Sequence, residues 1–177
     1  MKLYIKQKVF SIRDKFFVAN ENAENLYQVT GKIFSLGHKL TVQDMQEKEV
    51  VTIHQKVLSF LSKYFIASEG KEVEIERKIS VVPHFAVKEL DWDIKGNFLD
   101  HDYAITKDET AVATIKQKWI SWGDSYEIDV VNDADVLDVL GVVIAIDCIN
   151  ADINAATDTA VSGAGAVAAA AATSNNS

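Results

Sequence analysis

The sequence contains only one cysteine and one proline among its 177 residues. Cys148 has no second cysteine with which to form an internal disulfide, so a small disulfide-stabilised scaffold is excluded. It lies in an apolar run, and we expect a buried thiol rather than a nucleophile or a metal ligand. Pro83 cannot donate a hydrogen bond to a β-ladder, and we expect it at the end of a strand.

The sequence also lacks the short motifs of common enzyme classes. It contains no G-x-S-x-G, no Walker A loop and no G-x-G-x-x-G. Its four histidines, His38, His54, His84 and His101, show neither the HxH nor the HExxH spacing of metal sites. We therefore predict a protein that is not an enzyme and that holds neither a metal nor a cofactor.

Positive charge is absent from the last third of the chain. No Lys or Arg follows Lys118, whereas nine acidic residues do, so residues 1–118 carry a net charge of +1 and the remainder −9. Nucleic acids are bound through basic surfaces that displace counterions from the phosphates. We therefore predict no nucleic-acid partner.

The N-terminal residues lack the continuous apolar stretch of a secretory signal peptide, because alternating residues follow Lys2 directly. We expect a cytoplasmic protein. The length and the 48% apolar content predict one domain with a substantial core.

One fourteen-residue pattern occurs three times without a gap. It reads IKQKVFSIRDKFFV at 5–18, IHQKVLSFLSKYFI at 53–66 and IKQKWISWGDSYEI at 115–128. In each copy, two runs of β-branched and aromatic residues flank a short break, which is typical of a β-hairpin. The repeat extends further, since residues 29–56 align with 94–118. A period of about 60 residues predicts two similar halves of one closed structure.

The alignment of the two halves pairs Val29 with Ile94, Gly31 with Gly96, and His38 with His101. About twelve segments along the chain have β character and are separated by turn-type residues. These segments are approximately 2–10, 15–20, 25–31, 38–43, 49–59, 63–68, 71–80, 84–89, 91–96, 102–106, 111–121 and 125–131.

A helical segment follows the last predicted strand. Asn132 or Asp133 can cap its N-terminus, and its body is apolar on every side, which requires burial in protein or in lipid. Only eight uncharged residues separate Asp138 from Asp147, whereas a membrane span takes about 20. We therefore predict a buried core helix at about 132–151. The residues that we expect it to bury are Val136, Leu137, Val139, Leu140, Val142, Val143, Ile144, Ile146 and Ile149.

Strands and helix fit one another in size. Twelve tilted strands enclose a space that side chains alone do not fill, and that space is about as wide as one helix. The sequence thus predicts a mainly β fold: a closed antiparallel barrel of about twelve strands from two similar halves, around one central hydrophobic C-terminal α-helix. We assign residues 1–153 to this domain. Residues 154–177 are rich in Ala, Ser, Asn and Gly, and we predict a low-complexity, disordered tail.

The chain resembles the LURP-one-related family, of bacterial type, which is grouped with the tubby C-terminal domains and the phospholipid scramblases. The resemblance rests on four stretches, KQKVFSIRDKFFV, YQVTGKIFSLGHKLTVQD, EVVTIHQKVLSFLSKYFI and DVLDVLGVVIAIDCIN. It implies a twelve-stranded barrel around a hydrophobic C-terminal helix. It transfers no catalytic motif. Tubby domains bind phosphoinositide headgroups and scramblase relatives associate with membranes, so the resemblance makes anionic lipid one candidate ligand. The tubby phosphoinositide site has no residue-by-residue match in this sequence, and none of its residues is carried over.

Five lysines of the repeated hairpins are candidates for such contact: Lys6, Lys8, Lys56, Lys116 and Lys118. On a rigid barrel they could meet anionic headgroups, each contributing about 1 kcal/mol near the surface. The alternative is that strand lysines only keep the outer face soluble and discourage edge pairing.

The two acids of the predicted core helix, Asp138 and Asp147, are unusual in an apolar segment. They could face the mouths of the barrel or pair with a lysine, or they could make the helix responsive to protons or cations. For the whole chain we predict a non-enzymatic cytoplasmic binding or scaffold module, peripheral to the membrane if it recognises anionic lipid, with a protein partner as another option. A scramblase-like protein anchored by residues 136–149 and a small-molecule carrier at a barrel mouth are the alternatives.

Overall fold

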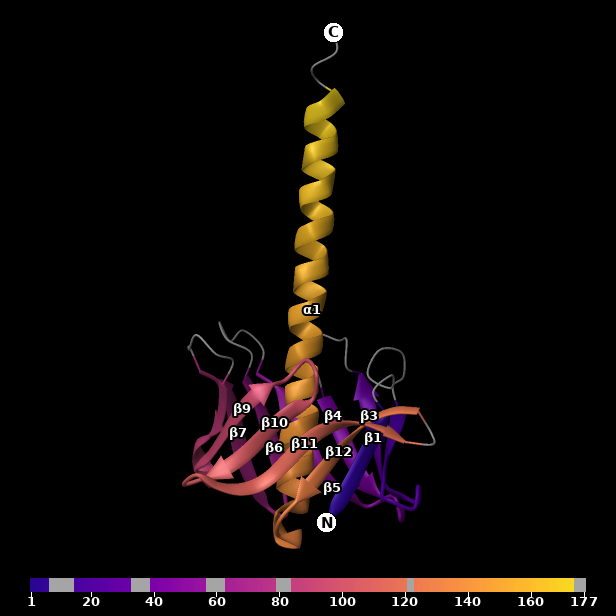
Figure 1. Ribbon diagram of the computed structural model, residues 1–177, viewed down its shortest axis with the longest axis vertical. Helices are drawn as coiled ribbons and strands as arrows, with labels where there is room; N and C mark the ends of the chain where they lie inside the picture. Colours follow the sequence, from indigo (N-terminus) through magenta and orange to yellow (C-terminus); the bar gives the residue numbers. More distant parts are fainter. Residues whose placement is uncertain (7–14, 33–38, 57–62, 79–83, 121–122, 174–177) are drawn as a thin grey trace.

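The computed structural model shows a β-barrel through which one helix runs and then projects beyond it (Figure 1). The structure describes the backbone of residues 1–6, 15–32, 39–56, 63–78, 84–120 and 123–173. Within these ranges it describes the side chains at all positions except 6, 32, 119–120, 123–124 and 155–173. Pro83, His38 and the break of the first two repeated hairpins lie outside the described residues.

Twelve strands are present among the described residues, and neighbouring strands are antiparallel. They are β1 (Lys2–Lys6), β2 (Lys15–Ala19), β3 (Asn25–Lys32), β4 (Lys39–Asp44), β5 (Glu49–Gln55), β6 (Lys63–Ser68), β7 (Lys71–Arg77), β8 (His84–Val87), β9 (Trp92–Asn97), β10 (Asp102–Lys107), β11 (Thr110–Ile120) and β12 (Gly123–Val130). Short 3₁₀ turns at Lys88–Leu90 and Asp133–Asp135 precede β9 and α1 (Val136–Thr173). The first strand pairs with the last, with Leu3 opposite Ile128, and this closes the barrel as predicted.

The described strands on either side of each break in the fourteen-residue pattern pair antiparallel, as the predicted hairpins require. The first and last residues of the pattern lie opposite one another in all three copies: Ile5 with Val18, Ile53 with Ile66 and Ile115 with Ile128. All six side chains are buried. The repeated pattern is therefore a repeated structural unit whose ends point into the barrel.

The two halves also match at their glycines. Gly31 lies opposite Leu40, and Gly96 lies opposite Tyr103, with φ angles of +138° and +141°. A Cβ at these positions would lie 2.3 Å from the Lys39 carbonyl oxygen and 2.5 Å from the Asp102 carbonyl oxygen, respectively. Both positions require glycine because a side chain has neither the space nor a favourable backbone conformation there.

The helix α1 fills the barrel. The Asn132 side chain accepts a hydrogen bond from the Ala134 amide and caps the turn that leads into it. The nine residues predicted for burial belong to the core or, for Leu137, pack against it. The contact is tight at Gly141, where a Cβ would lie 2.5 Å from Cγ2 of Ile66 and 3.1 Å from Cγ1 of Val51. The helix therefore lies directly against β5 and β6.

The helix is longer than the sequence predicts. It was expected to end at about residue 151 and to be followed by a disordered tail from 154, whereas α1 extends to Thr173. Alanine has the highest helix propensity of the natural residues and dominates this segment, which also contains no proline. Local propensity therefore favours continuing the helix beyond the core, into the projecting part in Figure 1.

A candidate ligand pocket at the mouth of the barrel

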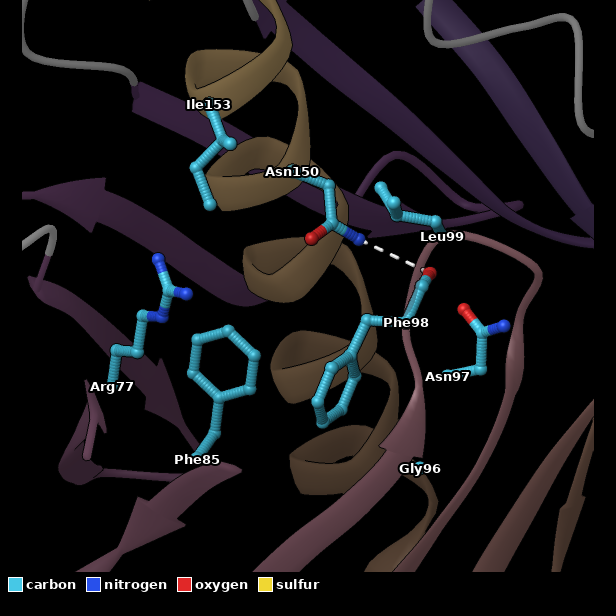
Figure 2. Close-up of a pocket in the computed structure, with 8 residues that line it drawn as sticks. All are labelled: Arg77, Phe85, Gly96, Asn97, Phe98, Leu99, Asn150 and Ile153. Carbon is cyan, nitrogen blue, oxygen red and sulfur yellow. Dashed lines mark hydrogen bonds between the residues drawn. The ribbon is translucent and has the colours of Figure 1, made fainter. Parts of the chain in front are cut away.

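The helix α1 emerges from one end of the barrel (Figure 1). A pocket lies beside the helix at this end (Figure 2). Its volume is about 430 Å³, within the range of about 300–1,000 Å³ that is typical of small-molecule sites. The lining side chains come from the ends of β7 and β9, from β8, from the turn after β9 and from α1. They belong to Arg77, Phe85, Gly96, Asn97, Phe98, Leu99, Asn150 and Ile153.

Aromatic side chains form the inner wall of the pocket. Phe98 is buried, and its ring meets the ring of Phe85 edge-on, with the centroids 4.8 Å apart. On its other side Phe98 contacts Tyr103 at a centroid distance of 5.0 Å. Leu99, the next residue, is 62% exposed. The pocket therefore passes from a buried aromatic floor to an apolar rim.

The pocket has few polar groups. Asn150 Nδ2 donates a hydrogen bond to the Phe98 carbonyl at 3.2 Å, which fixes the turn after β9 to α1. Asn97 Nδ2 donates to Asp100 Oδ2 at 2.6 Å and is thus engaged within the turn. Arg77 is exposed and forms no ion pair with any residue that the structure describes. Figure 2 shows it on the β7 side of the cavity, across from Asn150 on the helix.

The turn after β9 is fixed to the helix by a second contact, beneath the pocket. His101 Nε2 lies 3.0 Å from Asp147 Oδ1, and the hydroxyl of Tyr126 donates to Asp147 Oδ2 at 2.5 Å. The rings of His101 and Tyr126 stack with centroids 4.2 Å apart. Both carboxylate oxygens of Asp147 are therefore occupied, one from the β9–β10 turn and one from β12.

Burial and the negative charge of Asp147 together shift the pKa values of its neighbours. Burial lowers the pKa of His101, but the hydrogen bond and the negative charge of Asp147 outweigh it, so the pKa lies above the usual 6.5. Burial, followed by the same charge, raises the pKa of the Tyr103 and Tyr126 hydroxyls well above 10. His101 Nδ1 and the Tyr103 hydroxyl are buried and have no hydrogen-bond partner in the described part of the chain.

Asp138, the other acid of α1 that the sequence analysis singled out, has its partners on the β6–β7 side of the barrel. It accepts a hydrogen bond from the Ser68 hydroxyl and forms an ion pair with Lys71, whose Nζ lies 3.0 Å from Oδ2. Asp138 is buried, whereas the Lys71 side chain is 54% exposed. The lysine partner that the sequence analysis considered is thus present for Asp138, and a histidine takes that role for Asp147.

The candidate lysines whose positions the structure describes lie on or beside several strands of the barrel. The backbones of Lys6 and Lys118 flank Ser125 of β12 from opposite sides, whereas Lys56 follows β5, several strands away. Lys118 Nζ lies 3.8 Å from Glu127, which also pairs with Lys2. Lys8 and the side chain of Lys6 lie outside the described residues.

Two of these lysines are exposed and have no acidic partner among the residues that the structure describes. Lys116 lies on β11, and Lys56 Nζ lies 5.7 Å from the centroid of the Phe65 ring. Lys56 and Lys116 are thus separate positive side chains on different parts of the barrel, and a headgroup site at the lysines stays a prediction.

Other sequence expectations concern reactivity and membranes. Cys148 is fully buried as predicted, and burial raises the pKa of its thiol well above the usual 9. In the described part of the chain, no group of three or more His, Cys, Asp or Glu side chains is placed to hold a metal ion. No described helix combines the length and apolar character that crossing a membrane requires.

Sequence reasoning named a barrel mouth as a possible carrier site, but it did not name the residues of the pocket. They are scattered between residues 77 and 153 and come together only when the barrel closes. One signal was available. Phe98 and Leu99 are two large apolar residues in the predicted turn after residue 96, where polar residues are usual.

The comparisons with known proteins agree with this architecture. A family model described as LURP-one-related matches residues 1–147. The chain is 34% identical to the uncharacterised protein YxjI of Bacillus subtilis (strain 168), over 84% of this chain and 93% of that one. A crystal structure of a protein from Arabidopsis thaliana matches with a TM-score of 0.57 at 16% identity, over 82% of this chain and 90% of that chain. The predicted kinship is confirmed: the chain belongs to the LURP-one-related family.

Proposed function

We propose that the protein is a non-enzymatic binding module that holds a small, mostly apolar ligand in the pocket at the mouth of the barrel. The observation that carries this proposal is the cavity of about 430 Å³ between Phe85, Phe98 and α1. Its polar lining groups are Arg77, Asn97 and Asn150, and the described lining residues include no carboxylate, imidazole or thiol. Such a lining suits binding better than acid–base chemistry.

A fluorescent apolar probe tests this function. Nile red should bind the full-length protein with a rise in emission, because the pocket removes it from water. Leu99→Trp should reduce this binding because the larger side chain occupies the mouth. Val131→Trp is the matched control, since Val131 is 69% exposed and does not line the pocket. Absence of probe binding, or equal binding by both variants, would contradict the proposal.

A second candidate function is that the protein is cytoplasmic and recognises anionic phospholipid with the outer face of the barrel. Its support is that Lys116 and Lys56 are exposed and without acidic partners among the described residues. Co-sedimentation with anionic vesicles at low and high salt tests it. A variant carrying Lys56→Glu and Lys116→Glu should lose the sedimentation, while Leu99→Trp should keep it. Equal binding to anionic and zwitterionic vesicles would contradict the proposal that the lysines recognise anionic headgroups.

A further inference from the structure

The lining of the pocket divides into an apolar part and one cation, and this division indicates the class of ligand. Phe85, Phe98, Leu99 and Ile153 offer apolar contacts from the floor to the rim, and Arg77 lies at one side. We propose that the ligand is a free single-chain amphiphile with one carboxylate, such as a fatty acid. Its chain lies against the four apolar side chains and its carboxylate pairs with Arg77. This inference rests on the proposed function, because it names the ligand class of the same pocket.

Arg77 is suited to hold the carboxylate. Its guanidinium is always charged and offers two parallel N–H donors to the two oxygens of a carboxylate. The acid next to it in the chain does not compete, because successive residues of a strand point to opposite faces. Glu76 is instead paired with Lys63, Lys78 and Lys88, and the hydrogen bond from Lys78 contributes most to lowering its pKa to about 2.

The number of charges favours a monoanion. Arg77 is the one cation among the described lining residues, and no acidic side chain accompanies it. A carboxylate matches this single charge. A phosphate monoester carries about −1.5 to −2 at neutral pH and would remain partly uncompensated in an apolar pocket.

The size and the opening of the pocket favour one chain. The volume of about 430 Å³ lies near the lower end of the range of about 300–1,000 Å³ for small-molecule sites. Leu99 and Ile153 are 62% and 37% exposed and form an apolar rim. A hydrocarbon chain can pass this rim without desolvating a charged group, while the carboxylate stays at the exposed Arg77.

Three ten-carbon probes test the inference on the full-length protein by calorimetry, below the concentrations at which they form micelles: decanoate, decanol and decyltrimethylammonium. Decanoate should bind at least about tenfold more tightly than decanol, the size of effect expected for a charge-assisted pair, and the cation should bind most weakly. Arg77→Gln should reduce decanoate to the affinity of decanol without changing decanol. Lys95→Gln, which removes an exposed cation from β9 outside the pocket, should change neither.

The outcomes separate this inference from the proposed function. Equal affinity for decanoate and decanol, with Nile red still bound, would overturn the carboxylate assignment and leave the pocket function standing. Failure of Nile red and of all three amphiphiles to bind would overturn both. Arg77-dependent sedimentation with anionic vesicles, without decanoate binding, would replace the free amphiphile by a membrane lipid. The comparison of the three probes on the unmodified protein decides the question even if the Arg77 variant folds poorly.

Discussion

Tyr64 and Tyr126 occupy the same position in two copies of the repeated hairpin, yet their hydroxyls donate to different acids of α1. Tyr64 donates to Asp152 at 3.0 Å, and Tyr126 donates to Asp147 at 2.5 Å. The two acids are five residues apart on one helix. The comparison teaches that a duplicated barrel cannot present equal surroundings to a single helix, because the helix has no internal symmetry that matches the two halves.

The surroundings of the two acids differ accordingly. Asp152 is partly exposed, and Gln55 Nε2 donates to it at 3.1 Å as a second, neutral partner. Asp147 is buried and its second partner is His101. The helix packs tightly against β5 and β6 at Gly141, and the pocket opens beside β7, β8 and β9. The asymmetry thus separates a tightly packed side from a side that has room for a ligand.

The largest effect should come from removing the buried acid. Asp147→Ala leaves Tyr126 and His101 without their acceptor, and breaking a buried pair of this kind typically costs about 3–5 kcal/mol. Asp152→Ala acts on a partly exposed group and should cost about 1 kcal/mol. Urea denaturation of both variants measures the difference. Equal losses would mean that the two halves hold the helix equally.

The equivalent tyrosines provide a milder version of the same comparison. Tyr126→Phe should cost about 1.5–3 kcal/mol, because it removes a hydrogen bond to a buried carboxylate. Tyr64→Phe should cost about 0.5–1.5 kcal/mol, because Asp152 keeps Gln55 and contact with water. Chemical denaturation provides both values. The comparison would fail if the Tyr64 variant were the less stable of the two.

The close contact on the β5–β6 side can be tested at Gly141. In an exposed helix, replacing glycine by alanine stabilises by about 1 kcal/mol. Here Gly141→Ala should destabilise by about 1–3 kcal/mol, because the new Cβ would overlap Cγ2 of Ile66. The double variant with Ile66→Ala should show a favourable coupling between the two sites in a mutant cycle. A stabilised single variant would show that the helix is not seated against β6.

The smallest effect concerns pH. The pKa of His101 is raised in the folded state, so the folded protein holds this proton more tightly than the unfolded chain does. The resulting stability is fully present below pH 6.5, the ordinary pKa of a histidine in the unfolded chain. It is lost as the pH rises through the pKa of His101 in the folded protein. The difference in unfolding free energy between the unmodified protein and His101→Gln should therefore shrink from mildly acidic to mildly alkaline buffer. A difference that grows with pH would contradict the assigned direction.

The alternation and repetition of the sequence predict most of the barrel, because each strand carries its own apolar face. The predicted segments match all twelve strands, and the buried residues of α1 follow from its apolar body. The helix continues to Thr173, beyond the predicted end at about residue 151, because alanine can continue a helix without a core. The partners of its acids were not predictable either, since Lys71 and His101 are 67 and 46 residues away from Asp138 and Asp147.

The residues of the candidate site were harder to predict from the sequence than the fold. Lys56 and Lys118 hold equivalent places in the repeat, which suggested a shared role, but the strand order places them on different parts of the barrel. Arg77 and Phe98 have no repeated counterpart that would draw attention to them. Arg77 and Phe98 line one pocket only because the end of β7, the β9–β10 turn and α1 lie together in the closed barrel. A local sequence pattern does not predict this arrangement.

The closure of the barrel has a consequence for the synthesis of the chain. Lys2 and Glu127, which meet across the seam, are separated by 125 residues. A nascent chain therefore leaves the ribosome with its apolar inner face uncovered until β12 and α1 have followed, and such surfaces promote aggregation during folding. The helix that shields the strands follows all of them in the chain, so the apolar face of each strand stays uncovered until α1 has been made.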